Sequence, residues 1–499
     1  APARFGRGLL RLRSGDLQGA GEDFDVAISA QPRHAGALNN RGLTYARSGD
    51  LDRAIEHYSR ALEADPKFAT ALRNRAEAWQ AKREPDKALS DLDAALVLDP
   101  GNPWAHNQRG IIFARKGDYR TAIESHGSAL ALSPDYGAAF RARGNARAET
   151  GDYRGAAADY DEAIRVDPTD AEALHNRGWI HRRNGARDKA IADFDRAIEI
   201  APKYQRAWRH RADTRLEAGD LPGAIKDYTE AVRLDPRDAD ALNNRGWARL
   251  SVGQRSDALA DFDKAIEVNP GMVVAWRNRG NTRLATGDLT RAIADLDEAV
   301  RLSPDDVPSL NARGIARHRG QDLAAAEADL TRAIKLDARY APAYFSRAGV
   351  RFDMRGYSGA IEDLNTAIRL DARNANALNM RAWILLKLAR IDEAKRDVTR
   401  ALELAPRFAA AIDTLAHVLL MEGDTEAAIR EFDRAIALGL DGPVPFAGRG
   451  QAREKVKDTA RAIEDYRQAV GSPVRGVDDR IAQMLARERL AVLERPAAP

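Results

Sequence analysis

Asparagine side chains recur through the sequence at a spacing that could serve peptide binding. Several stand 34 residues apart, as Asn40 and Asn74 do, and Asn244 and Asn278. A primary amide donates and accepts hydrogen bonds at the same time, so a row of amides could bind an extended peptide backbone whatever its sequence. The candidate peptide-binding residues are Asn40, Asn74, Asn107, Asn176, Asn243, Asn244, Asn278 and Asn311. The alternative is that asparagine before Arg-Gly only belongs to a repeat consensus.

Arginine and aspartate form a second recurring set. Counted from Ala1 in steps of 34, position 7 is arginine in thirteen of fourteen repeats, with Leu415 the exception, and position 11 is arginine in eight. Position 23 is acidic in twelve repeats. One interpretation is a structural ladder in which arginine 7 pairs with the carboxylate at position 23 of a neighbouring helix. The other is an arginine surface for an anionic ligand.

No recurring set resembles a catalytic centre. The sequence contains no phosphate-binding glycine loop, paired-histidine zinc motif or nucleophile elbow. It has no cysteine, which excludes thiol chemistry, and its nine histidines are scattered, His175 and His181 being the closest pair. We therefore predict no catalytic residues, no metal site and no cofactor.

The charge balance and hydropathy bound the partners. With 78 lysines and arginines against 75 acidic residues, the chain lacks the basic excess expected of a nucleic-acid-binding protein. No apolar run approaches the roughly 20 residues that a membrane span needs, so membrane insertion is not expected.

The elements that must position these residues follow from the same period. Alanine recurs every 34 residues from Ala20 to Ala462 and again from Ala27 to Ala469, while position 8 is always glycine or alanine. Position 24 is large in thirteen repeats, with His126 the exception. Such a period is typical of a stacked helical solenoid. The predicted repeats are 1–34, 35–68, 69–102, 103–136, 137–170, 171–204, 205–238, 239–272, 273–306, 307–340, 341–374, 375–408, 409–442 and 443–476, followed by a capping helix and tail at 477–499.

Residues 35–68 illustrate one repeat. Ala35–Arg47 suits a first helix, and Ser48-Gly49-Asp50 supplies its end and a turn. Asp50 can cap a second helix that runs to about Ala64, and Asp65-Pro66 closes the repeat because proline disfavours helix at the residue before it. Two helices and two tight turns are therefore expected in each repeat.

A few turns depart from this pattern. Gly320 and Gly356 lie off the usual turn position, and Ala389-Arg390 has no turn glycine. Residues 439–445 are the most loop-like stretch. We expect changed curvature at these places.

The order of small, large and proline positions resembles the tetratricopeptide repeat (TPR) family over residues 1 to about 472. The resemblance implies an all-α, right-handed α-solenoid superhelix of antiparallel helix pairs, whose first helices line a concave groove. It also implies that the asparagines face this groove as an asparagine ladder. The expected function is a non-catalytic scaffold for protein–protein interaction that binds extended peptide segments.

A narrower set, Arg141, Asn145, Asn176, Arg206 and His210, resembles the carboxylate clamp of TPR co-chaperones, which binds the C-terminal carboxylate of a peptide. Arginine replaces both lysines of that pattern and histidine replaces its arginine. Such a clamp is expected to weaken as His210 loses its proton near neutral pH. Arginine and asparagine are common at these positions, so coincidence is the competing interpretation.

Two other roles stay open. The first helix is expected to expose Phe5, Leu9, Leu10 and Leu12, with no cap before it, which could support a self-assembling array or a homo-oligomer through the N-terminal repeat. The chain could also be the targeting region of a larger multidomain enzyme. It begins without methionine, which fits either a missing upstream region or a processed end. The composition is bacterial-like and favours a soluble, cytoplasmic protein over an exported one, while the compartment stays unknown.

Overall fold

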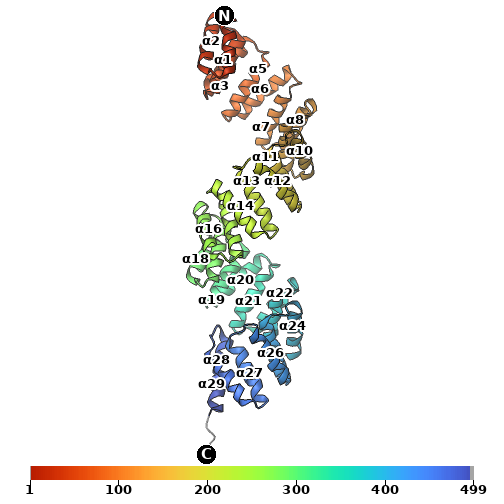
Figure 1. The fold of residues 1–499 in the computed structure, drawn as a ribbon, viewed down its shortest axis with the longest axis vertical. Coiled ribbons are helices and arrows are strands. Elements are labelled where there is room, and N and C mark those ends of the chain that lie inside the picture. Colours follow the sequence, from red (N-terminus) through yellow and green to blue (C-terminus); the bar gives the residue numbers. More distant parts are fainter. Residues whose placement is uncertain (1, 495–499) are drawn as a thin grey trace, which may run out of the picture. The chain divides into compact units, whose positions relative to one another are not determined.

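The computed structural model describes residues 2–494, and within that range the chain forms helices joined by short turns, with no β-strand. It divides into two compact halves, residues 1–248 and 249–499, which are described separately below. Consecutive helices pack against each other in pairs, as Figure 1 shows. The chain is therefore an all-α solenoid, as the period predicts.

The N-terminal half holds α1 to α15, of which α15 continues three residues into the other half. The helices are α1 (Pro2–Ser14), α2 (Leu17–Ala30), α3 (Ala35–Arg47), α4 (Leu51–Ala64), α5 (Ala69–Ala81), α6 (Pro85–Leu98), α7 (Pro103–Arg115), α8 (Tyr119–Leu132), α9 (Gly137–Glu149), α10 (Tyr153–Val166), α11 (Ala171–Arg183), α12 (Arg187–Ile200), α13 (Gln205–Glu217), α14 (Leu221–Leu234) and α15 (Ala239–Ser251). Odd-numbered helices are the first helices of the repeats and even-numbered helices are the second.

The C-terminal half holds the remaining helices. They are α16 (Arg255–Val268), α17 (Val273–Ala285), α18 (Leu289–Leu302), α19 (Val307–Arg319), α20 (Leu323–Leu336), α21 (Ala341–Asp353), α22 (Tyr357–Leu370), α23 (Ala375–Lys387), α24 (Ile391–Leu404), α25 (Ala409–Glu422), α26 (Thr425–Ala437), α27 (Pro443–Lys455), α28 (Thr459–Gly471) and α29 (Val477–Leu493).

The turn inside each repeat has one geometry. The amide of Asp50 donates to the carbonyl of Tyr45, and Gly49 takes a φ of +88°, which together close the first helix. The Asp50 carboxylate then accepts from the amide of Arg53 and caps the second helix. The predicted helix bounds, turn and cap of this repeat are confirmed.

The turns without a glycine keep the same geometry. Position 15 of the repeat has a positive φ in every repeat, including five where it is not glycine: Arg83, Gln321, Arg355, Ala389 and Lys457. At Ala389 the amide of Arg390 still donates to the carbonyl of Leu385 at 2.9 Å. Packing of the flanking helices therefore imposes a left-handed conformation that costs a side-chain-bearing residue about 1 kcal/mol.

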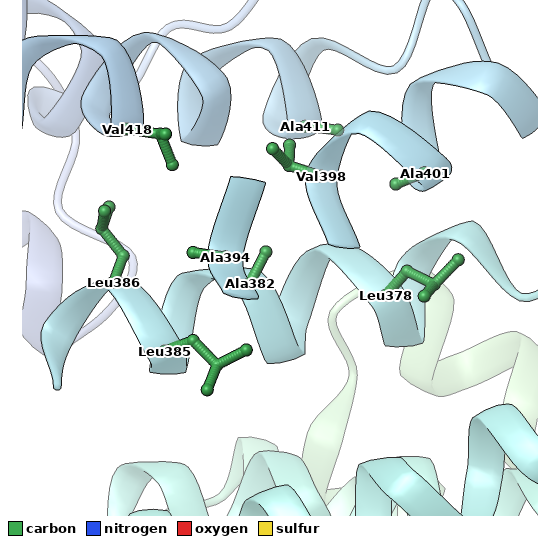
Figure 2. Close-up of a cluster of buried hydrophobic side chains, with 9 residues drawn as sticks. All are labelled: Leu378, Ala382, Leu385, Leu386, Ala394, Val398, Ala401, Ala411 and Val418. Atoms are coloured by element: carbon green, nitrogen blue, oxygen red, sulfur yellow. The ribbon is translucent and has the colours of Figure 1, made fainter. Parts of the chain in front are cut away.

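Small residues bring the two helices of a repeat close together. The alanines at positions 20 and 27 are completely buried, and a Cβ atom added to Gly144 would lie only 2.7 Å from the Tyr160 ring. The core is a series of local clusters that join neighbouring helices. Figure 2 shows one of them, formed by Leu378, Ala382, Leu385 and Leu386 of α23, Ala394, Val398 and Ala401 of α24, and Ala411 and Val418 of α25.

The first helix exposes fewer apolar side chains than expected, whereas the last helix packs as expected. In α1 only Leu10 is strongly exposed, whereas Leu12 is buried and Phe5 and Leu9 pack against the buried Phe24 ring. The expectation of four exposed apolar side chains is wrong because α2 covers three of them. At the other end α29 packs on α27 and α28 through Ala482 and Ala486, as a capping helix should.

Candidate functional site

The repeated arginines at position 7 bind the repeated aspartates at position 23. In repeat 7, Arg211 donates from Nε and Nη2 to the two oxygens of Asp227 at 2.8 and 2.7 Å. The same pairing joins Arg7–Asp23, Arg75–Asp91, Arg143–Asp159, Arg177–Asp193, Arg279–Asp295, Arg313–Asp329, Arg347–Asp363, Arg381–Asp397 and Arg449–Asp465. We call this set the arginine–aspartate ladder. The predicted structural pairing is confirmed.

Most position-7 arginines also reach position 25 of the preceding repeat. Arg211 Nη1 donates to Asp195 at 2.5 Å, and Arg279 Nη1 donates to Asp263 at 2.6 Å. Where position 25 is not acidic, Thr331 accepts from Arg347 and Asn365 accepts from Arg381. One guanidinium therefore links three helices of two adjacent repeats, which the sequence pattern did not predict.

Arginines at position 11 complete the ladder. Arg215 donates to Asp227 at 2.7 Å, and Arg283 donates to Asp295 at 2.7 Å. The position-23 aspartates are almost fully buried. Hydrogen bonds to Asp193 raise the pKa of Arg177 still further above its ordinary value. These charges are neutralised inside the repeats, so the geometry favours a structural role over an anion-binding surface.

The position-6 asparagines of the N-terminal half lie partly exposed on first helices. Asn74 Nδ2 donates to Asn39 Oδ1 and Asn176 Nδ2 donates to Asn145 Oδ1, both at 2.9 Å, so each bond joins adjacent repeats. Asn244 Nδ2 lies 3.4 Å from Asp213 Oδ1. Asn40 donates to the carbonyl of Gly36 in its own helix. In the other half, Asn278 is likewise partly exposed on α17.

The position-5 asparagines behave differently. Asn107, Asn243 and Asn311 are only 3%, 4% and 8% exposed. Asn107 Oδ1 lies 2.8 Å from His126 Nδ1, so this amide serves an internal contact. These three amides are therefore buried, whereas the position-6 amides are partly exposed. Sequence spacing alone could not predict this difference, because adjacent residues of a helix point in different directions.

Several residues of the possible carboxylate clamp are already bonded to other side chains. Arg141 is paired with Asp170 at 2.7 Å and Glu172 at 3.3 Å. Asn145 accepts from the Tyr160 hydroxyl as well as from Asn176, while Arg206 lies exposed on α13. A peptide carboxylate would therefore have to compete with two protein carboxylates for Arg141.

His210 is paired instead with His175, and of the two rings only that of His175 is almost fully buried. The Nδ1 atom of His210 lies 2.8 Å from His175 Nε2, and the two rings stack with centroids 4.9 Å apart. Burial, the His175 ring and the Arg209 guanidinium lower the pKa of His210 to about 3. The expected loss of a His210 proton near neutral pH is therefore wrong, because the ring is already neutral there. The 35-residue spacing of the pair was the available sequence signal.

His126 replaces the large side chain of position 24 and predicts a pH effect. Its ring is completely buried, and burial followed by Arg143 lowers its pKa to about 4. Below the ordinary pKa of about 6.5 the unfolded chain takes up a proton that the folded protein refuses until about pH 4. Stability is therefore lost as the pH falls through that window, by on the order of 2 kcal/mol at pH 5.

His126→Phe should lack this loss. Hydrogen exchange of α7 and α8, measured for both proteins at pH 7 and pH 5, checks it. If the protection factors of α7 and α8 fall equally in the two proteins between pH 7 and pH 5, His126 is not held neutral by burial.

Another group of polar side chains in the C-terminal half was missed. Asn379, Trp383, Asp413 and Asp478 line a pocket of about 280 Å³. Asp413 is the one acidic residue at position 5, and it lies in the one repeat without arginine at position 7. Those two departures could have drawn attention to it.

Residues 2–494 contain neither a group of metal-binding side chains nor a membrane-spanning helix. Between residues 2 and 494, no three histidine, aspartate or glutamate side chains are grouped so as to hold a metal ion. No helix in that range combines the length and apolar character needed to cross a bilayer.

Comparison with known families places the chain among helical-repeat proteins. A tetratricopeptide repeat model matches residues 39–103, 141–204, 244–307 and 379–445, and a TPR repeat model matches residues 212–253. The matches span more than half of the chain, which therefore belongs to the tetratricopeptide repeat family. It is a protein-binding scaffold of the kind that this family forms, and the fold is generally non-catalytic.

Several solved structures resemble parts of the chain. The crystal structure of MamA is 26% identical over 32% of this chain and 95% of its own, with a TM-score of 0.31. A tetratricopeptide repeat protein from Parabacteroides merdae is 21% identical over 50% of this chain and 98% of its own (TM-score 0.40). YrrB, described as a TPR protein with an unusual peptide-binding site, is 24% identical over 38% and 96% (TM-score 0.34). No curated protein matches the chain in sequence.

Proposed function

We propose that this chain is a non-catalytic scaffold that binds extended peptide segments of protein partners through the position-6 asparagines of its first helices. One observation carries the proposal. In the N-terminal half, Asn40, Asn74, Asn176 and Asn244 are partly exposed, while the arginines that follow them in sequence donate to carboxylates or hydroxyls of second helices. Uncharged amides are therefore what these helix positions offer to a partner.

The chemistry of an amide suits a peptide backbone. A primary amide has two N–H donors and two acceptor lone pairs, so a bond to a neighbouring repeat orients the side chain and leaves further capacity. A peptide strand repeats one donor and one acceptor per residue. Each net hydrogen bond contributes roughly 0.5–1.5 kcal/mol, so a few such contacts are enough for measurable affinity.

The asparagine variant tests this proposal. A protein with Asn40, Asn74, Asn176, Asn244 and Asn278 changed to alanine should bind a captured partner at least about tenfold more weakly, since about 1.4 kcal/mol is tenfold in affinity. Partners are first captured with the unaltered chain from lysate of the source organism. Their binding segments are then synthesised as peptides and titrated.

The control variant carries Gln18→Ala and Gln468→Ala, which remove exposed amides from second helices. Its affinity should equal that of the unaltered chain. Equal affinity of all three proteins for every partner peptide would assign the asparagines to the interior scaffold and refute the proposal.

Self-assembly through the first helix has less support, because α1 leaves only Leu10 strongly exposed among its four large apolar side chains. Sedimentation at several protein concentrations distinguishes an assembling array from a monomeric scaffold. A role as the targeting region of a larger enzyme is compatible with the proposed peptide binding.

A further inference from the structure

The pocket near α23 and α25 has a wall that comes from the end of the chain. Trp383 Nε1 donates to Asp478 Oδ2 at 2.6 Å, and Lys387 Nζ lies 2.8 Å from Asp478 Oδ1. Asp478 is in the first turn of α29, 95 residues away in sequence. The start of α29 is thereby held on α23, and the space between them is the pocket of about 280 Å³.

Asp413 faces this pocket without a compensating charge. Its side chain belongs to a residue only 7% exposed, and its Oδ1 accepts no hydrogen bond. The nearest basic nitrogen is His417 Nε2 at 3.8 Å. Burial lowers the pKa of His417 to about 4, so that ring is neutral at physiological pH.

A second acceptor in the same pocket lacks a donor. Asn379 Oδ1 is buried and accepts no hydrogen bond. A buried acceptor without a donor destabilises the protein by about 1–3 kcal/mol, so a ligand that supplies N–H groups to both acceptors would be favoured in this pocket.

The charges around the pocket also favour a cation. Lys387 is paired with Asp478, and Arg475 donates to both oxygens of Asp441 at 2.7 and 2.9 Å. Asp479 accepts from the backbone amide of Arg475 and lies close enough to its guanidinium to interact with it electrostatically. Asp413 is therefore the acidic group at this site without a cationic partner.

We propose that this pocket binds one organic cation, an alkylammonium or guanidinium group of the kind that lysine and arginine carry. Such a group supplies several N–H donors and a positive charge to Asp413 and Asn379. The volume admits one side-chain-sized group, at the lower end of ordinary ligand pockets. A metal ion is disfavoured, since no three ligating side chains gather among the described residues.

Binding should be coupled to the release of a proton. Burial alone raises the pKa of Asp413 to about 8, so the empty pocket holds it protonated at pH 7. A bound cation favours the carboxylate, and the proton leaves. The other titratable or charged groups that face or adjoin Asp413 are His417, Lys387, Arg475, Asp478 and Asp479. This coupling distinguishes a ligand-binding carboxyl from one that is only structural.

The test uses the full chain and three small probes, which are N-acetyl-lysine methylamide, N-acetyl-arginine methylamide and the uncharged N-acetyl-norleucine methylamide. We expect a saturable shift of the Trp383 indole N–H resonance, assigned with Trp383→Phe, with the lysine or arginine probe and not with norleucine. The two cationic probes separate ammonium from guanidinium preference. Calorimetry at pH 7 in buffers of different ionisation enthalpy should show proton release on binding.

Asp413→Asn keeps the size of the side chain and removes its charge. It should weaken cation binding at least tenfold and abolish proton release, while Asp433→Asn, an exposed carboxylate paired with Arg449 in the same half, should change neither. The five-asparagine variant should bind the probes normally, because this site does not depend on the proposed peptide surface.

Several outcomes overturn the proposal. They are no shift with either cation, equal affinity for norleucine, or equal affinity of Asp413→Asn and the unaltered chain. The first would indicate that water alone fills the pocket. A folded Asp413→Asn protein is verified by its amide spectrum, so a loss of binding is not confused with unfolding.

Discussion

The Asp227→Ala protein is expected to lose about 3–5 kcal/mol of the free energy of unfolding in its α13–α14 pair. Asp227 is completely buried and accepts hydrogen bonds from Arg211 and Arg215. Removing the carboxylate leaves two guanidinium groups close together and partly buried without their counter-ion. The cost is mainly that of uncompensated buried charge, which is larger than the net worth of the pair itself.

Two matched variants identify the cause. Asp195→Ala removes the other carboxylate that Arg211 binds, but this residue is half exposed, so the loss should stay below about 1 kcal/mol. Arg211→Leu and Arg215→Leu added to Asp227→Ala should recover at least half of the loss, because no buried charge is then left without a partner. The chain supplies a precedent in Leu415 and Leu419, which occupy these two positions in repeat 13.

Hydrogen exchange resolved by segment is the appropriate measurement, since repeat arrays need not unfold as one cooperative body. Protection of α13 and α14 should fall strongly in Asp227→Ala and much less in the triple variant. If Asp195→Ala and Asp227→Ala lower the protection of α13 and α14 equally little, the arginine–aspartate ladder does not stabilise the repeats. Its arginines would then need another role.

Much of the fold could be predicted because the repeat forces the same local decisions fourteen times. Gly49 must take a positive φ, Asp50 must cap α4, and arginine 7 must meet an acid at position 23 of the helix beside it. Each prediction depends only on residues within about 20 positions of each other. Local chemistry and helix periodicity are sufficient at that range.

The predictions that went wrong, and the contacts that were missed, depend on burial or on distance. Leu12 and Asn107 are buried because another helix covers their side of the helix, while neighbouring residues on the other side are exposed. Packing of the flanking helices imposes the left-handed turn at Ala389, although alanine does not favour a positive φ. The contact between Trp383 and Asp478 joins residues 95 positions apart, and no periodic pattern encodes it because α29 lies outside the repeat.

Internal pairing of the charges has a consequence for recognition. Arginine is the residue best suited to bind carboxylates or phosphates, yet most of the repeated arginines already hold aspartates within the repeats. Departures from the repeat are therefore better guides to binding chemistry than the repeat itself. Asp413, in the one repeat without arginine at position 7, is the strongest example.

The second large effect is expected at position 8, where Gly144→Leu should cost about 2–3 kcal/mol. A Cβ atom at residue 144 would meet Tyr160 Cε1 at 2.7 Å, and the Tyr160 hydroxyl is fixed by its bond to Asn145 at 2.8 Å. The ring is buried and bonded at its far end, so a large side chain must push α9 away from α10. Hydrogen exchange in these two helices, with thermal unfolding of the whole chain, measures the loss.

Gly144→Ala is the control that the chain itself recommends. Ala212 occupies the same position opposite the buried ring of Tyr228, so this interface accommodates one methyl group. Alanine should therefore change stability by no more than about 1 kcal/mol, because its better helix propensity offsets a small displacement. Adding Tyr160→Ala to Gly144→Leu makes room for the new side chain, and the combined loss should be clearly less than the sum of the two single losses. A purely additive result would mean that the leucine acts on α9 alone, and that close approach of the two helices is not the reason why position 8 is always small.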